Sequence, residues 1–179
     1  PAATQSWSRV FDVGTGTTAN MFLTPRAGVT GTPVRFAITT TGGGGEQQIN
    51  GTGPLPVNTW THVAVTKSGT TGVLWLNGVP VGTNTNVTLS PSSMGNTNNN
   101  WIGRSQYGDP LLDGSVDNFH IFSNALTEEQ IQSLMTSPGG DTGGGNVVSY
   151  RFDEDGGNTV VDSSGNGRDG TVEPPLVGE

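Results

Sequence analysis

The chain contains no cysteine among its 179 residues, which excludes disulfides and thiolate metal sites. Basic residues are scarce as well: Lys67 is the single lysine, and seven basic residues stand against 15 acidic ones, which gives a formal net charge of -8. Because no basic field exists to attract phosphate groups, nucleic acid and anionic lipid are not expected as partners. Neutral ligands or cations fit this charge better.

Long hydrophobic runs are absent too. No stretch approaches the roughly 18 to 20 consecutive apolar residues that a membrane-spanning helix needs, so membrane insertion is not expected. Only 12% of the residues are charged, whereas 29 are glycine and 11 are proline. This composition is typical of short strands joined by tight turns, and it indicates an all-β protein.

Short segments of alternating apolar character recur along the chain to about residue 122. The pair Asn77-Gly78 lies between two of them and predicts a type I′ hairpin, because both central residues of that turn need a positive φ.

Trp7, Trp60 and Trp75 are expected in the core or under neighbouring strands, not as ligand platforms. The predicted strands cover residues 6–13, 20–25, 33–40, 46–50, 60–67, 72–77, 79–83, 100–104 and 114–122.

One helix is predicted over residues 126–135. Thr127 suits its N-cap and Gln130 suits the third helical position, which is the reciprocal arrangement of a capping box. A glycine-rich stretch at 138–146 follows and cannot continue the helix, so it is interpreted as a flexible linker. Strand-like alternation resumes over residues 147–172.

Three blocks carry a family resemblance: Trp60–Gly82, Trp101–Ser105 and Leu112–Phe122. In this order and at these spacings they resemble the later two thirds of a laminin-G-like module of the concanavalin-A-like lectin/glucanase kind. The resemblance implies an antiparallel jelly-roll sandwich of two packed sheets. Phe11–Gly16 and Met21–Pro25 resemble the variety appended to secreted bacterial glycoside hydrolases, including enzymes that act on arabinose-containing polysaccharides.

The family's opening segment stands at an unusual place in this sequence. Tyr150–Glu154 and Val161–Gly170 resemble that opening, yet they follow the sandwich, and no such strands precede the Trp7 region. A sandwich without its opening strands leaves a sheet edge uncovered. We therefore predict a sandwich over 1–137, a linker over 138–146, and an opening strand and loop over 147–179 that docks on a sandwich. Residues 147–152 are expected to pair as a strand with the sandwich formed by residues 1–137, of the same or a neighbouring chain.

The resemblance implies a non-catalytic carbohydrate-binding or accessory module of a secreted bacterial polysaccharide-degrading enzyme. Its partners would be a polysaccharide or oligosaccharide and the other domains of the parent polypeptide. Catalysis by this chain itself is not expected, because no predicted strand carries the alternating carboxylates that glycosidases hold ~5 to 9 Å apart. Two alternatives stay open: a structural or adhesion module that contacts other protein domains, and a part of a glycoside hydrolase whose catalytic residues lie outside this chain.

Sugar binding requires an aromatic face that stacks on the sugar ring and polar groups that bond its hydroxyls. The stretch from Trp101 to Asp109 has an aromatic residue near each end. Trp101 itself is expected in the core, and the alternative for the rest is an ordinary loop. The candidate carbohydrate-binding residues are Arg104, Gln106, Tyr107 and Asp109.

The loop from 162 to 170 is a candidate calcium site. Asp162, Asn166 and Asp169 offer the oxygen ligands that Ca²⁺ prefers, and the glycines between them permit a tight turn. The family resemblance also implies a structural ion beside the opening strand. The alternative is an Asx-type turn, in which Asp162 and Asn166 bond their own backbone. Asp117 is a weaker candidate ligand.

Overall fold

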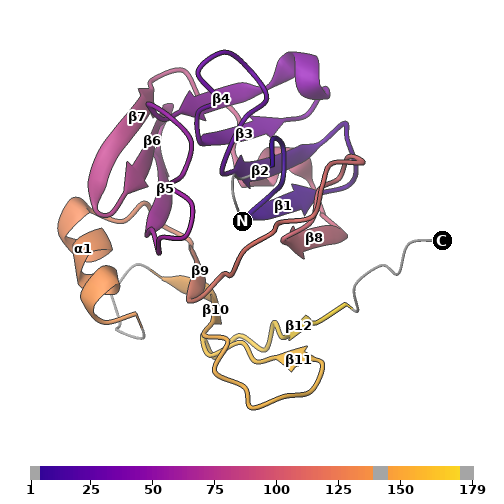
Figure 1. Ribbon diagram of the computed structural model, residues 1–179, viewed down its shortest axis with the longest axis vertical. Helices are drawn as coiled ribbons and strands as arrows, with labels where there is room; N and C mark the ends of the chain where they lie inside the picture. Colours follow the sequence, from indigo (N-terminus) through magenta and orange to yellow (C-terminus); the bar gives the residue numbers. More distant parts are fainter. Residues whose placement is uncertain (1–4, 139–144, 174–179) are drawn as a thin grey trace. The chain divides into compact units, whose positions relative to one another are not determined.

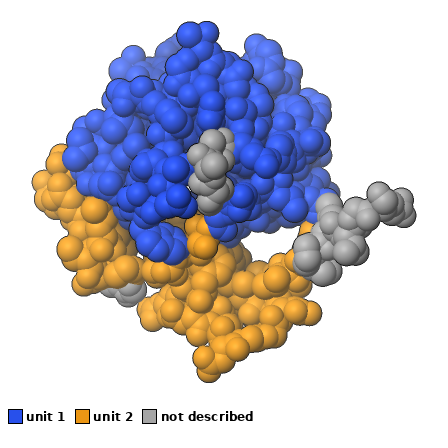
Figure 2. All heavy atoms as spheres, viewed as in Figure 1, with its two compact units in different colours: residues 1–114 blue, residues 115–179 orange. Residues whose placement is uncertain are grey.

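The structure is a computed structural model that describes residues 5–138 and 145–173. Its chain forms two compact units, Pro1–Gly114 and Ser115–Glu179, which are coloured separately in Figure 2. The described residues are mostly β, with antiparallel sheets and one short α-helix, as the sequence predicts.

Unit 1 contains two antiparallel sheets (Figure 1). The larger sheet has the order β4-β3-β2-β1-β8 and the smaller one has the order β5-β6-β7. The strands of the larger sheet are β1 (Phe11–Gly14), β2 (Asn20–Thr24), β3 (Arg35–Thr39), β4 (Gln47–Asn50) and β8 (Asn99–Ile102). The smaller sheet consists of β5 (Val63–Ser68), β6 (Thr71–Leu76) and β7 (Val79–Asn84), and two 3₁₀ turns, η1 (Gly43–Gly45) and η2 (Pro91–Met94), lie in the connections.

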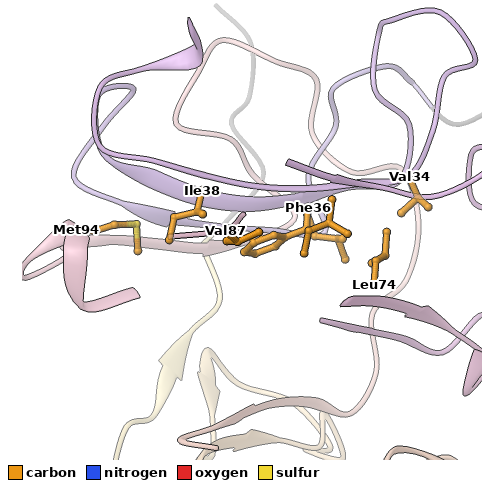
Figure 3. Close-up of a cluster of buried hydrophobic side chains, with 8 residues drawn as sticks. Val34, Phe36, Ile38, Leu74, Val87 and Met94 are labelled. Carbon is orange, nitrogen blue, oxygen red and sulfur yellow. The ribbon is translucent and has the colours of Figure 1, made fainter. Parts of the chain in front are cut away.

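The hydrophobic core lies between these two sheets. Leu74 of β6 is fully buried against apolar side chains from one face of the larger sheet, as Figure 3 shows. Since successive residues of a strand point to opposite faces, every second residue of β2, β3 and β4 reaches this core. The buried members of the cluster are Leu23, Val34, Phe36, Ile38, Ile49, Leu74, Val87 and Met94.

The opposite face of the larger sheet, here called the outer face, carries both polar and apolar side chains. Residues that pair directly across neighbouring strands share one face of a sheet. The register therefore places one row of side chains straight across the outer face, from β8 to β4: Trp101, Asp12, Phe22, Ala37 and Gln48.

Unit 2 begins with β9 (Phe119–Phe122) and the helix α1 (Glu128–Thr136), and continues with β10 (Asn146–Tyr150), β11 (Thr159–Val160) and β12 (Gly170–Thr171). β10 pairs with β9 of the same chain, with Tyr150 opposite Phe119. In the described part of the chain, β9 and β10 form a two-stranded sheet of their own, so the tail strand pairs with β9 and not with a strand of either sheet of unit 1. Within the described residues, no helix has the length and hydropathy needed to cross a membrane.

Local signals in the sequence are confirmed. Asn77 and Gly78 have φ values of 47° and 75°, so the hairpin between β6 and β7 has two positive φ angles, as predicted. The capping box of α1 is also present: the Thr127 side chain accepts a hydrogen bond from the backbone N–H of Gln130, and the Gln130 side chain accepts one from the backbone N–H of Thr127.

Two expectations about tryptophans are wrong. Trp60 is 70% exposed, because β5 starts only at Val63 and the strand does not extend back to it. Trp7 also lies outside the strands and outside the core cluster, since β1 starts only at Phe11. The predicted domain layout stays a prediction, and residues 139–144 of the linker and 174–179 of the tail lie outside the described residues.

The closest approach of the two sheets of unit 1 is testable at Gly82. A Cβ at this position of β7 would collide with the backbone oxygen of Asn50 in β4 and lie 3.4 Å from Cγ2 of Ile49. We expect Gly82→Ala to lower the free energy of unfolding by about 1–3 kcal/mol, because overpacking forces the sheets apart. All four tryptophans lie in unit 1, so urea unfolding followed by tryptophan fluorescence measures this change.

Gly53→Ala is the matched control, because no described atom lies within 4 Å of a Cβ placed there. Equal stability of the two variants would contradict this account of how the sheets meet.

Candidate functional site

The outer face of the larger sheet carries buried charged side chains. Arg9 is 3% exposed and Asp12 is fully buried. Burying a charge costs several kcal/mol unless it is paired and hydrogen-bonded, and a sheet needs only one apolar face to fold. The burial of these two charges costs free energy, and the hydrophobic core does not need it to form. The outer face is therefore a candidate for a functional site.

Arg9 is the centre of this arrangement. Its Nε lies 3.6 Å from Oδ2 of Asp12, and its Nη2 lies 3.0 Å from Oδ2 of Asp109. Its guanidinium carbon lies 3.9 Å from the ring centroid of Phe22, which is a cation–π contact. Its Nη1 donates a hydrogen bond of 2.6 Å to the backbone oxygen of Trp7. One cation thus joins β1, β2, the segment before β1 and the loop after β8.

The loop after β8 is held against this face. The backbone N–H of Gln106 donates to Oδ2 of Asp12 at 2.9 Å, a contact between residues 94 positions apart. Within the loop, the Ser105 hydroxyl donates to Asp109 at 2.8 Å and accepts from the backbone N–H of Tyr107 at 3.0 Å. The hydroxyl of Tyr107 donates to the backbone oxygen of Thr17 in the β1–β2 turn. The loop from 103 to 109 is therefore held by hydrogen bonds within itself, to β1 and to the β1–β2 turn.

The structure brings the four predicted sugar-binding residues together on this loop. The side chain of Gln106 exchanges hydrogen bonds with Asn99, and that of Asp109 bonds Ser105 and Arg9, so both act inside the protein. Arg104 and Tyr107 are partly exposed, as are Gln106 and Asp109. The expectation that Trp101 lies in the core is wrong. It lies on the outer face opposite Asp12, and the guanidinium carbon of Arg104 is 4.5 Å from its ring centroid.

A second group of polar residues lies on β3 and β4 of the same face. Nε of Arg35 donates to Oδ1 of Asn50 at 2.7 Å, and its Nη1 lies 3.9 Å from Oε2 of Glu46. The ring of Trp7 lies next to both buried arginines, with centroid distances of 5.6 Å to Arg9 and 5.5 Å to Arg35. Trp7 thus joins the Arg9 group to the Arg35 group.

Asp12 has an unusual ionisation equilibrium. Burial raises the pKa of its carboxyl to about 6, although the hydrogen bond from Gln106 and the charge of Arg9 lower it. Its second oxygen, Oδ1, accepts no hydrogen bond from any described residue. Burial also lowers the pKa of Arg9, against the effect of Asp109 and Asp12. The attraction between Arg9 and Asp12 and their hydrogen bonds therefore offset only part of the cost of burying the two charges.

Sequence reasoning missed Arg9, Asp12, Arg35 and Trp7 as site residues. One signal was available: Asp12 lies between Phe11 and Val13 in an apolar strand, and a carboxylate in such a place needs a cationic partner. The nearest arginine in the sequence is Arg9, three residues earlier. The contact with Gln106 has no comparable signal, because it depends on how β8 pairs with β1.

The predicted calcium loop in unit 2 is organised by its own hydrogen bonds. Oδ1 of Asp162 accepts from the backbone N–H groups of Ser149 and Ser164, and Oδ2 accepts from that of Arg168. Oδ1 of Asp169 accepts from the backbone N–H of Asp162, and the Asn166 amide donates to two backbone oxygens of β10. This is the Asx-type arrangement that was the alternative to a metal site.

The electrostatics of this loop agree with that arrangement. Burial by itself raises the pKa of Asp162, but hydrogen bonds from Ser164 and from the backbone N–H groups of Ser149 and Arg168 outweigh it, so that pKa lies below its usual value. Asp117 is exposed and precedes β9. In residues 5–138 and 145–173, no three histidine or carboxylate side chains gather as a metal site would require. Calcium binding stays a prediction.

Comparison with known proteins gives a family and a fold. A laminin G family model, described as the concanavalin A-like lectin/glucanases superfamily, matches residues 1–132. The structure is similar to that of a candidate carbohydrate-binding protein from Bacteroides ovatus, with 23% identity and a TM-score of 0.60 over 96% of this chain and 52% of that one. It also matches residues 221–444 of an S-layer domain-containing protein from Clostridium thermocellum, with 35% identity and a TM-score of 0.42 over 66% of this chain and 57% of that one. The chain therefore spans little more than half of each, and no curated protein matches it.

The raised pKa of Asp12 predicts how the stability of unit 1 changes with pH. The folded-state pKa of about 6 lies above the ordinary aspartate value of 3.8. Between these two pH values the folded chain therefore binds a proton that the unfolded chain does not bind. The free energy of unfolding should therefore fall as the pH rises from 4 to 7, relative to Asp12→Asn, by about 3 kcal/mol at most. Urea unfolding of both proteins across this range, followed by tryptophan fluorescence, measures the difference. A difference that does not vary with pH would contradict the raised pKa.

The Asp162 loop yields a prediction for unit 2. Asp162→Ala removes the acceptor of three backbone hydrogen bonds, so we expect it to destabilise unit 2 by about 2–3 kcal/mol. Amide hydrogen exchange of residues 146–173 measures this, because unit 2 has no tryptophan. The pKa of Asp162 is lowered, so its stabilising effect should be complete above about pH 4 and lost as the pH falls further.

Asp155→Ala, at an exposed position of the same unit, is the control. EDTA should leave the exchange rates unchanged if the loop depends on its N–H donors alone. A slower exchange on adding Ca²⁺, lost in Asp162→Ala, would instead support the calcium hypothesis.

Proposed function

The chain belongs to the concanavalin A-like lectin/glucanases superfamily, and from this membership we propose that it binds carbohydrate as a non-catalytic module. The outer face of the larger sheet, with the loop from 103 to 109, would be the binding surface. Arg104 and Tyr107 would contact the glycan, while Gln106 and Asp109 would hold the loop in shape.

One observation carries this proposal: buried charges and hydrogen bonds hold the side chains of the outer face in place. Apolar side chains at the same positions would also have allowed the sheet to fold. Arg9, Asp12 and Asp109 fix the loop before any ligand arrives. A preorganised polar surface with aromatic rings loses little entropy on binding and offers both stacking and hydroxyl contacts. Those are the requirements for recognising a sugar.

The carboxylates of this face support a non-catalytic role. Asp12 is fully buried, Asp109 is paired with Arg9, and Glu46 lies beside Arg35. A glycosidase needs two carboxyl groups that face each other across the scissile bond, one of them with a free oxygen for the sugar. Here Asp109 and Glu46 lie beside arginines, and Oδ1 of Asp12, which has no partner among the described residues, is fully buried.

The wider setting is also part of the proposal. We infer a place in a secreted bacterial polysaccharide-degrading enzyme, where the module would raise the local substrate concentration for a catalytic domain elsewhere in the polypeptide. The resemblance of Phe11–Gly16 and Met21–Pro25 to modules of such enzymes supports this setting, with arabinose-containing glycans as the first class to test.

A second candidate function is contact with another protein domain. Trp60 is 70% exposed and Val79 is 59% exposed, and they would mark a contact surface if they belong to one contiguous apolar patch. This candidate predicts that Trp60 matters for binding a protein domain and not for binding glycan.

Binding to a panel of polysaccharides tests the proposed function. The full chain should bind at least one of arabinan, arabinogalactan, xylan and galactan in pull-down and calorimetric assays, without releasing reducing sugar. Arg104→Ala and Tyr107→Ala should each weaken binding by about tenfold, because each removes a direct contact worth about 1.4 kcal/mol. Trp60→Ala is the control and should bind as the unaltered chain does. A chain that binds none of the four polysaccharides would refute the proposal.

A further inference from the structure

Trp7 has an unusual backbone conformation for a bulky residue, and it lies outside the hydrophobic core. We propose that Trp7 is the aromatic platform of the glycan site, on which one ring of a neutral sugar stacks. This inference rests on the carbohydrate binding proposed above and adds to it a contact residue and a class of ligand.

The backbone of Trp7 is strained. Its φ is 67°, in the left-handed region that bulky residues rarely adopt. The strain persists because both backbone groups are held: the N–H donates to the oxygen of Arg26 at 2.9 Å, and the oxygen accepts from Arg9 at 2.6 Å. Strained residues of this kind cluster at functional sites, so the strain at Trp7 motivates a functional hypothesis.

The indole ring is also fixed in position. It approaches Gly28 so closely that a Cβ on that residue would collide with Nε1 of the indole. The guanidinium carbons of Arg9 and Arg35 lie 5.6 Å and 5.5 Å from the ring centroid. Trp7 as a whole residue is nevertheless only partly buried, and it lies outside the core cluster. A large aromatic side chain that is held rigidly, yet left partly open to solvent, suits stacking on the apolar face of a sugar.

The charges around the ring indicate a neutral ligand. Arg9 faces Asp12 and Asp109, and Arg35 lies 3.9 Å from Glu46, so each flanking cation already has a carboxylate beside it. The outermost charged group of the Arg9 network is Asp109, which is 22% exposed, and the whole chain carries a net charge of -8. A uronic acid or sulfated sugar would meet repulsion, whereas a neutral ring would not.

The test uses two variants that disturb the platform in different ways. Trp7→Ala removes the ring, and Gly28→Ala displaces it while leaving Trp7 present. Calorimetry with arabinan and galactan should show affinity losses of about tenfold or more for both, with Trp7→Phe in between. Trp60→Ala and Gly53→Ala are the matched controls and should bind as the unaltered chain does. The unaltered chain should bind polygalacturonate more weakly than the neutral glycans at low salt.

The outcomes separate this inference from the proposed function. If the unaltered chain binds neutral glycan and both Trp7→Ala and Gly28→Ala keep its affinity, the platform is overturned while the function stands. If no glycan binds at all, the function fails first. Tighter binding to polygalacturonate would overturn the neutral class. Should Trp7→Ala fail to fold, as judged by tryptophan fluorescence, Gly28→Ala and Trp7→Phe decide the question.

Discussion

The organisation of unit 1 outside its core depends on one buried cation. Arg9 is 3% exposed, and a guanidinium in such a place costs several kcal/mol unless carboxylates and hydrogen-bond acceptors surround it. Asp12 supplies a charge from the sheet, Asp109 supplies one from the loop after β8, and the backbone oxygen of Trp7 accepts a hydrogen bond. The need to satisfy one side chain therefore draws three separate segments of the chain to the same place on the outer face.

This arrangement is a poor way to gain stability. Well-packed hydrophobic residues in place of a buried ion pair are often neutral or stabilising, and the sheet already has a complete apolar face in the Leu23 to Met94 cluster. What charges provide, and apolar contacts do not, is a single geometry, because hydrogen bonds are directional. The loop from 103 to 109 and the ring of Trp7 are the parts whose geometry is fixed in this way, and both contain partly exposed residues.

How far the sequence predicts the structure depends on how local each contact is. The Asn77-Gly78 hairpin and the capping box at Thr127 follow from neighbouring residues, and both were predicted correctly. The four candidate residues on the 101–109 stretch do gather on one loop, because proximity in sequence ensures it. Their roles were not predictable, since the hydrogen bond from Gln106 to Asp12 spans 94 positions. Trp60 and Trp7 were misplaced for a similar reason: alternation in sequence does not show where a strand begins.

Two buried aspartates show how such sites can be told apart. Asp162 is 6% exposed and accepts three backbone N–H bonds, and its pKa is lowered, so its carboxylate is more stable in the fold than in water. Asp12 accepts one N–H bond, leaves Oδ1 without a partner among the described residues, and has a pKa raised to about 6. The first carboxylate stabilises its loop, whereas the second carries an electrostatic cost. An electrostatic cost of this kind beside Arg9 and Trp7, with no counterpart in the Asp162 loop, is the physical reason for proposing the outer face of the larger sheet as the binding surface.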